Sequence, residues 1–414
     1  MSQGPPAAVP YSRCVAICQA LGRQWGSVVR WAKAAEPIWS PEQTAGFGEP
    51  APAPAPIADM PRTGHYLLML DRLGLTLPIV QAPMAGVSTP TLAAAVSETG
   101  ALGSIAVGAT DAAGAQEMVD AVRSRTQRAF NVNVFAHQAP QRSQEREAAW
   151  LSTLEPTFHS FGSEPPSTLS VIYTSFAEDD EMLAVLLHLR PAVVSLHFGL
   201  PEAARINALK QAGCFLLATA TNLDEARAAV EAGVDAIVAQ GWEAGGHRGT
   251  FDQEAHDDRL GTVALTRLLV KRIRVPIIAA GGIMDGQGIR AMLDLGATAA
   301  QLGTAFIGCP ESAADEGYRA ALFSPAAEHT TMTRAISGRP ARCLANAFTR
   351  LASGLDVSPP DYPLAYDAGK ALHAAAKAAG QNGFGAQWAG QGAPLARALP
   401  AADLVAALAS EMHV

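Results

Sequence analysis

The chain has 414 residues, of which 49% are hydrophobic and 16% are charged, and its formal net charge is −8. This composition excludes a chain that is disordered throughout, and the length suits one barrel with insertions as well as two or three domains. The acidic balance offers no basic surface for nucleic acid, and no apolar run is long enough to span a membrane. The five cysteines are too widely spaced for a disulfide framework, so we expect a cytoplasmic protein.

The first 59 residues have the composition of an extension to the folded protein. Residues 1–40 are basic and amphipathic, which fits an organelle transit peptide; a start codon upstream of a true start at Met60 is the alternative that we favour. Residues 49–56 contain a proline at every second position, which enforces extended backbone and predicts a linker. We expect residues 1–59 to be disordered and residues 60–414 to fold.

From residue 77 onward, short apolar runs alternate with amphipathic stretches. Near-continuous apolar character is typical of parallel strands that are buried on both faces. The eight runs predicted to be strands are 78–83, 101–107, 130–135, 193–199, 214–220, 236–241, 275–282 and 299–306. They predict an α/β TIM (β/α)8 barrel, with an open doubly wound sheet as the alternative. Two longer segments, 136–192 and 310–400, are predicted to be helical insertions, the second lying over the barrel mouth.

Capping residues predict where individual helices begin and end. Thr89 and Pro90 predict the start of a helix that ends at Gly100, because threonine caps a helix, proline suits its first turn, and glycine follows its last. Asp224 is expected to cap a helix over residues 225–231.

Polar residues occur at the carboxyl ends of the predicted strands, where barrel enzymes carry their reactive groups. The first strand leads into Gln-Ala-Pro-Met-Ala-Gly-Val-Ser-Thr-Pro at 81–90, either an ordinary turn or fixed backbone lying close to a flat ligand. The third strand carries Asn131 and Asn133, whose side chains point to the same face. Buried amides need partners, which either a ligand or a local hydrogen-bond network would supply.

The sixth predicted strand leads into a glycine-rich segment with one histidine. Residues 240–249 read Gln-Gly-Trp-Glu-Ala-Gly-Gly-His-Arg-Gly, which has too much glycine for a helix or a strand. Such backbone places amides and an imidazole near a ligand, and His247 would titrate near neutral pH. A histidine in a glycine-rich loop at a barrel mouth is more often functional than structural.

The last two predicted strands carry a candidate phosphate site. They end in Ala-Gly-Gly-Ile at 280–283 and Gln-Leu-Gly-Thr at 301–304. The loops after strands 7 and 8 form the recurrent phosphate site of this barrel, and glycine amides can bind a phosphate without a basic residue. The pair of motifs therefore explains how an acidic protein could hold a phosphate.

Taken together, these motifs resemble those of the nitronate monooxygenases, formerly called 2-nitropropane dioxygenases. The resemblance covers about residues 67–400 and is most specific around the histidine. Two C-terminal segments, Ser-Gly-Arg-Pro at 337–340 and Trp-Ala-Gly-Gln-Gly at 388–392, resemble the class I branch. Cys343 departs from the family, which often has glycine there. The resemblance implies a barrel that binds FMN, uses O₂ and needs no nicotinamide cofactor.

The resemblance also implies roles for individual residues. Those expected to bind FMN are Pro83, Met84, Ala85, Gly86, Asn133, Gln240, Gly245, Gly246, Gly281, Gly282, Gln301, Leu302, Gly303 and Thr304. His247 is expected to be catalytic, either as a base or as a group that orients the anionic substrate. Tyr362, Tyr366 and Lys370 are expected to form the substrate pocket, although the spacing of the last two also fits a solvated helix surface. No metal site is expected.

The implied reaction is the oxidation of alkyl nitronates, such as propionate 3-nitronate, by O₂ to a carbonyl compound and nitrite. Three alternatives remain open: an FMN-dependent NAD(P)H reductase of enoyl thioesters or quinones, a flavin-free barrel isomerase or dehydrogenase, and a flavin-binding protein without activity. The expected partners are a small nitronate and O₂, not nucleic acid or membrane. The sequence leaves a homodimer open.

Overall fold

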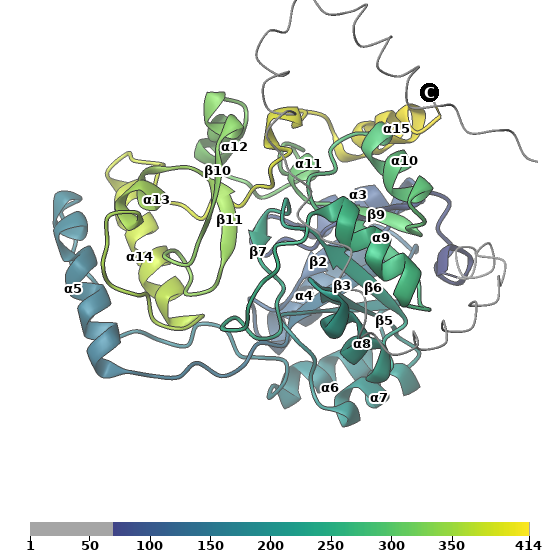
Figure 1. Cartoon of the computed structure of the whole chain (residues 1–414), viewed down its shortest axis with the longest axis horizontal. Helices are drawn as coiled ribbons and strands as arrows, with labels where there is room; N and C mark the ends of the chain where they lie inside the picture. The colour runs from purple at the N-terminus through teal and green to yellow at the C-terminus, as the bar shows by residue number, and fades with distance from the viewer. Residues whose placement is uncertain (1–68, 414) are drawn as a thin grey trace, which may run out of the picture. The chain divides into compact units, whose positions relative to one another are not determined.

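Eight parallel strands form the centre of the protein in the computed structural model, which describes residues 69–413 (Figure 1). These strands are β1 (Ile79–Gln81), β2 (Gly103–Ala106), β3 (Phe130–Phe135), β4 (Val193–His197), β5 (Phe215–Ala220), β6 (Ala236–Gln240), β8 (Ile277–Ala280) and β9 (Ala299–Leu302). Their order is β1-β9-β8-β6-β5-β4-β3-β2, and a bridge between Val80 and Leu102 joins its two ends. The predicted TIM (β/α)8 barrel is confirmed.

Helices cover the outside of the barrel. Those that follow the strands are α3 (Pro90–Glu98), α4 (Ala112–Arg123), α6 (Asp180–Leu189), α7 (Ala203–Gln211), α8 (Leu223–Glu231), α9 (Thr262–Arg272), α10 (Gly286–Asp294) and α11 (Thr304–Ile307). Side chains alternate along the strands: Val194 and Leu216 pack with the helices, whereas Val193 and Leu217 belong to a second apolar cluster inside the barrel. A last helix, α15 (Ala401–Glu411), packs against α3 and α10.

The capping predictions have different outcomes. Helix α3 begins as predicted, since the backbone N–H of Leu92 donates to the Thr89 hydroxyl at 3.0 Å. The predicted cap at Asp224 is wrong: Asn222 caps α8, with its Oδ1 accepting from the amide of Glu225 at 2.9 Å. The extended backbone of Asn222 places its side chain over the first turn, and Asp224 lies within that turn.

The eighth predicted strand is too long. It ends at Leu302 instead of residue 306, and α11 begins at Thr304. Apolar character continues through residues 305–307, so the apolar pattern alone did not distinguish a buried strand from the buried helix that follows it.

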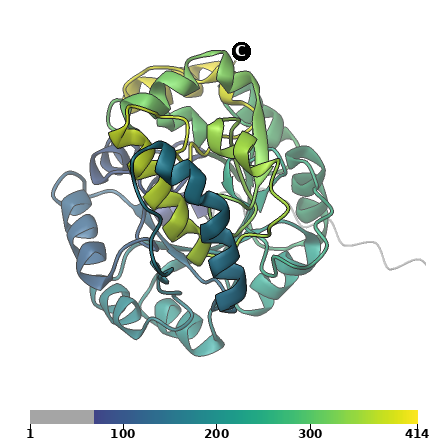
Figure 2. The same ribbon diagram turned by 90° about the vertical axis from the view of Figure 1, so that its left-hand side faces the viewer.

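The segment 136–192 contains two helices with different positions. Helix α6 packs against α4 and α7 and so completes the ring around the barrel. Helix α5 (Gln144–Ser160) instead leaves the ring and packs beside α14 (Leu364–Ala378), as Figure 2 shows.

The segment 310–400 combines helices with a β-hairpin that the sequence did not predict. Its elements are α12 (Glu316–Leu322), η2 (Pro325–Glu328), β10 (Thr330–Thr333), β11 (Ala341–Leu344), α13 (Ala347–Ala352), α14 and η3 (Ala393–Leu395). Strand β11 pairs with both β10 and β7 (Gly246–His247), which comes from the barrel. The extension is therefore joined to the barrel through the predicted histidine segment.

Part of the sequence-based prediction concerns residues without a described structure. The expected extension and linker, residues 1–59, lie outside the described residues. Within residues 69–413, no helix combines the length and the apolar character needed to cross a membrane.

Candidate active site

A cavity of about 370 Å³ lies at the carboxyl ends of the barrel strands and extends to the residues of the 310–400 segment. It brings together most of the residues singled out from the sequence. Those that line it are Pro83, Met84, Ala85, Gly86, Asn133, Gln240, Gly245, Gly246, His247, Gly281, Gly282, Gln301, Gly303, Thr304, Tyr362, Tyr366 and Lys370. Leu302 is not among them, because its side chain packs in an apolar cluster with Ile79 and Phe306.

Sequence reasoning missed several residues that line the same cavity. They are Phe135, Tyr173, Ser195, His197, Phe198, Thr219 and Tyr318. A signal was present for two of them, since Ser195 and His197 are polar residues at alternate positions of an apolar strand. Their Cα partners in β3 are Asn133 and Phe135, so this part of the rim is built by neighbouring strands.

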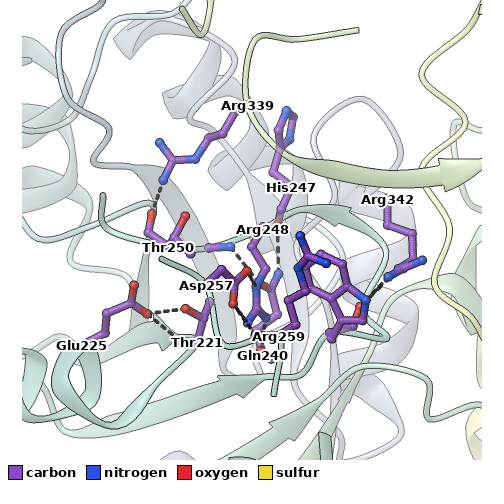
Figure 3. A network of polar contacts seen from close by, with 12 residues as sticks. Thr221, Glu225, Gln240, His247, Arg248, Thr250, Asp257, Arg259, Arg339 and Arg342 are labelled. Carbon is purple, nitrogen blue, oxygen red and sulfur yellow. Dashed lines mark hydrogen bonds and ion pairs between the residues drawn. The ribbon is translucent and has the colours of Figure 1, made fainter. Parts of the chain in front are cut away.

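His247 is held by a short strand and by one glutamine. Strand β7 pairs His247 with Ala341 of β11. The Gln240 side chain then spans the segment: its Nε2 donates to the carbonyl of His247 at 2.9 Å, and its Oε1 accepts from the amide of Gly249 at 2.7 Å (Figure 3). The prediction that this glycine-rich segment forms no strand is therefore wrong at Gly246–His247. The partner strand β11 is far from β7 in the sequence, so the local composition could not predict the pairing.

The imidazole of His247 lies among aromatic rings. Its centroid is 5.4 Å from that of Phe198, 5.4 Å from Tyr362, 5.9 Å from Tyr366 and 5.0 Å from Trp388. The Nε2 atom has one polar partner among the described residues, the Ser337 hydroxyl at 2.9 Å. These rings remove water from most of the imidazole and leave its polar contacts few.

The positive charge of Arg339 and burial act together on the three histidines of this region. Burial, followed by the charge of Arg339, lowers the pKa of His137 and of His197 to about 4. The pKa of His247 lies well below its usual value, first through burial and then through His197 and Arg339. The guanidinium of Arg339 lies 4.3 Å from the centroid of Phe198 and donates to the carbonyl of Thr250. All three imidazoles are consequently neutral at pH 7.

Helix α14 brings its predicted residues to the cavity. Burial raises the pKa of Tyr366 and of Tyr173 to about 12, so both phenols are protonated. The Lys370 ammonium lies 4.9 Å from the centroid of Tyr173 and 5.5 Å from that of Tyr366. Lys370 itself remains exposed, so its position combines a solvated helix face with the edge of the cavity. The Tyr362 hydroxyl is buried and has no partner among the described residues.

Glycines allow three loops that line the cavity to approach one another closely. A Cβ atom at Gly245 would lie 2.4 Å from the backbone nitrogen of Gly390, and one at Gly392 would lie 2.8 Å from the carbonyl oxygen of Gly282. Gly282 also has a φ of +71°, which disfavours any side chain there. Side chains at Gly245 and Gly392 would collide with backbone, so the close approach of these loops depends on bare glycine. We call the site formed by Gly245, Gly282, Gly303, Thr304 and Gly392 the glycine cradle.

This cradle offers hydrogen-bond donors without a cation. The amides of Gly282 and Gly303 donate to no backbone carbonyl within residues 69–413. The Thr304 hydroxyl accepts from the amide of Gly390 at 3.0 Å, which leaves its own proton free to donate. Such a set of amides and one hydroxyl suits a phosphate group.

Gln81 and the two asparagines have partners that explain part of their presence. The Gln81 Oε1 accepts from the amide of Ser104 at 2.8 Å, and its Nε2 donates to the Ser88 hydroxyl at 2.9 Å, which fixes the 82–88 turn. Asn133 donates to Ser195 through Nδ2, at 3.1 Å to the carbonyl and 3.0 Å to the hydroxyl. Asn131 lies deeper, where its Nδ2 donates to Ser104 and its Oδ1 is unpartnered among the described residues. A local hydrogen bond thus accounts for the Nδ2 group of Asn131 only, whereas Asn133 also reaches the cavity.

Comparisons with known proteins agree with this architecture. The family model described as nitronate monooxygenase matches residues 68–411. A nitronate monooxygenase from Paraburkholderia phytofirmans is 61% identical over 85% of this chain and 96% of its own length. Another, from Pseudomonas aeruginosa, is 53% identical over 83% of this chain and 100% of its own length.

Solved structures show the same relationship in three dimensions. A nitroalkane oxidase from Streptomyces ansochromogenes has a TM-score of 0.77 at 42% identity, covering 84% of this chain and 98% of its own. FabK from Thermotoga maritima has a TM-score of 0.64 at 28% identity, covering 84% of this chain and 96% of its own. With the matching motifs assembled around one cavity, the chain belongs to the nitronate monooxygenase family of flavin-dependent oxidoreductases.

Proposed function

We propose that this protein uses FMN to oxidise alkyl nitronates, such as propionate 3-nitronate, with O₂ to a carbonyl compound and nitrite. The observation that carries the proposal is that one cavity contains both the glycine cradle and His247. FMN, when bound, supplies the electron transfer from the nitronate to O₂, while the protein supplies position and environment.

The cradle fits the phosphate of FMN. Its donors are the free amides of Gly282 and Gly303 and the hydroxyl of Thr304. Gly245 and Gly281 belong to the same loops, and a Cβ atom at Gly281 would lie 2.7 Å from the Thr262 hydroxyl. The chain can therefore hold a dianion despite its net charge of −8, because these donors are dipoles fixed by the backbone.

The other proposed flavin contacts follow the cavity wall towards His247. The 83–86 turn, which Gln81 and Ser88 fix, would contact the ring through its backbone. Asn133 and Gln301 also line the wall, and each has an amide for the ring or the ribityl chain. Gln240 has one N–H and one acceptor position remaining after its contacts with His247 and Gly249.

Substrate would bind between the flavin and the residues of α14. His247 has a depressed pKa, so it is a neutral imidazole at pH 7 and can accept a proton. Among the described residues that line the cavity, Lys370 is the one lysine or arginine, and its ammonium suits an anionic nitronate. Tyr362 would donate to the substrate through the hydroxyl that lacks a protein partner.

An absorbance spectrum of the purified protein tests the flavin, and nitrite release tests the reaction. We expect a bound flavin that an alkyl nitronate bleaches under anaerobic conditions, with nitrite formed when O₂ is admitted. Bleaching by NADH or NADPH, but not by nitronate, would establish the reductase alternative instead. A colourless protein would favour the flavin-free barrel enzyme, and a flavin inert to all three would indicate a binding protein.

The role of His247 has its own test. The variant His247→Ala should retain FMN and lose most turnover, by a factor of about 10² or more, because general-base contributions have this size. Full turnover in this variant would remove His247 from the mechanism.

A further inference from the structure

The Ser337 hydroxyl lies behind the imidazole of His247. Its Oγ is 2.9 Å from His247 Nε2, and Ser337 is fully buried. The same Oγ is 3.2 Å from the carbonyl oxygen of Arg339 and 3.4 Å from the amide nitrogen of Arg339. Three polar atoms therefore share one hydroxyl.

The direction of these hydrogen bonds follows from what each atom can do. A hydroxyl has one proton to donate and two positions that accept. The carbonyl of Arg339 can only accept, and among the described residues the Ser337 hydroxyl is its one hydrogen-bond donor. If Ser337 donated to His247, this buried carbonyl would lose its partner. The hydroxyl proton is thus assigned to Arg339, and Ser337 accepts from His247 Nε2.

The other ring nitrogen of His247 faces open space. Within residues 69–413, Nδ1 has no hydrogen-bond partner, and it is not among the enclosed polar atoms that lack one. Because His247 lines the cavity, the accessible side of Nδ1 is the cavity side. A neutral imidazole carries one proton, so a proton on Nε2 leaves a lone pair on Nδ1.

We infer that Ser337 is a positioning residue that keeps the proton of neutral His247 on Nε2, so that Nδ1 is the proton-accepting atom in the cavity. Ser337 acts through His247 and does not itself line the cavity. The inference rests on the proposed role of His247 and narrows it, because this tautomer presents a base, not a donor, to the substrate. The opposite tautomer would present an N–H that orients an anion.

Nuclear magnetic resonance of the flavin-loaded protein with ¹⁵N-labelled histidine reads the tautomer directly. The variant His247→Gln identifies the signals of His247 by their disappearance. At pH 7 we expect a protonated Nε2 and an unprotonated Nδ1 in the wild type. In Ser337→Ala we expect the second tautomer to appear and kcat/KM for the substrate to fall about tenfold or more, since the acceptor that selects the tautomer is gone.

Ser97 provides a matched control. It is also fully buried, donates to the carbonyl of Ala129 at 3.0 Å and accepts from the amide of Gly103 at 3.2 Å. It does not line the cavity. Ser97→Ala therefore removes an equivalent buried hydroxyl, and it should leave the His247 signals and kcat/KM unchanged.

The outcomes separate this inference from the proposed function. A wild-type spectrum with the proton on Nδ1, or an unchanged tautomer in Ser337→Ala, would overturn the inference. Equal losses of kcat/KM in the Ser337 and Ser97 variants, without a change of tautomer in either, would reduce Ser337 to a structural role. If the expected tautomer is observed but no nitrite forms from nitronates, the proposed function fails and the role of Ser337 stands.

Discussion

Arg248 and Asp257 meet through two hydrogen bonds, with Nε–Oδ2 at 2.8 Å and Nη2–Oδ1 at 3.0 Å. The Arg248 side chain is 1% exposed, and its Nη1 also donates to the carbonyl of Gln240 at 2.5 Å. The ion pair therefore fastens the segment after His247 to the end of β6, close to where Gln240 holds the histidine itself (Figure 3).

Asp257→Ala should destabilise the protein because it leaves the Arg248 charge buried without its partner. Loss of one member of a buried ion pair costs about 3 kcal/mol. Urea unfolding at pH 7 measures the change in the free energy of unfolding. The control is Asp294→Ala, which breaks the Arg290–Asp294 pair at 2.9 Å, where both side chains are more than half exposed. That change should cost less than about 0.5 kcal/mol, and equal losses in both variants would contradict the role given to Asp257.

The buried histidines should make the protein less stable as the pH falls from about 6.5 to about 4. The unfolded chain binds protons on His137 and His197 near pH 6.5, whereas burial and Arg339 hold their folded pKa values at about 4. The contribution of these two neutral histidines to the free energy of unfolding is therefore fully present above pH 6.5, and it is lost as the pH falls from about 6.5 to about 4. Each histidine contributes a slope of up to about 1.4 kcal/mol per pH unit.

A substitution of one of these histidines isolates its contribution to the change of the unfolding free energy with pH. His137 has an unpartnered, buried Nδ1 and packs edge-on to Tyr362 at 5.0 Å, so His137→Phe suits the site. Chemical unfolding at several pH values should give a shallower slope for this variant. His256→Gln is the control, since that side chain is 88% exposed and should leave the slope unchanged. A slope unaffected by His137→Phe would show that His137 titrates normally in the folded protein.

The barrel was predictable from the sequence because its signal is local. Each strand is a short apolar run, and several helices carry their own capping residue, such as Thr89 before α3. The site was partly predictable for the same reason, since the first residues after a barrel strand lie at the mouth. His247 and Gly282 follow β6 and β8 closely in the chain, and both line the cavity.

The features that could not be predicted from the sequence depend on contacts between segments that are far apart in the chain. The strand at His247 exists because β11, about a hundred residues later, pairs with it. The resemblance implied Gln240 as a flavin contact, but its amide also holds the histidine segment, which only the folded loop reveals. Ser337 reaches His247 from the turn between β10 and β11, and no spacing in the sequence connects the two.

Gly282→Ala should weaken FMN binding more than it weakens the fold. The backbone has a φ of +71° there, and an added Cβ would lie 3.2 Å from the Glu243 side chain, within the cradle. Strain of about 1 kcal/mol follows from the backbone alone. A shift of the cradle should raise the dissociation constant for FMN about tenfold or more, which titration of the flavin-free protein by flavin fluorescence measures.

Gly74→Ala is the control for that strain. Gly74 has a φ of +64°, nothing lies within 4 Å of its added Cβ, and it does not line the cavity. It should show a similar loss of stability and unchanged FMN affinity. If Gly282→Ala binds FMN as tightly as Gly74→Ala does, the glycine cradle does not hold the phosphate of FMN.

Tyr362→Phe should lower activity without lowering stability. The Tyr362 hydroxyl is buried without a partner among the described residues, and an unsatisfied buried polar group costs about 1–3 kcal/mol. Its removal should therefore leave the unfolding free energy unchanged or raise it by about 1 kcal/mol. If that hydroxyl donates to the substrate, kcat/KM for nitronate should fall by about tenfold in the same variant.

Tyr318→Phe provides the contrast, because the Tyr318 hydroxyl donates to the carbonyl of Trp388. Its loss leaves that carbonyl without its donor, so this variant should be less stable than the wild type by about 1 kcal/mol. Thermal unfolding of the flavin-loaded proteins, with nitrite assays on the same samples, compares the two. A Tyr362→Phe protein that lost stability as Tyr318→Phe does would mean that its hydroxyl has a structural partner, and the activity argument for Tyr362 would fail.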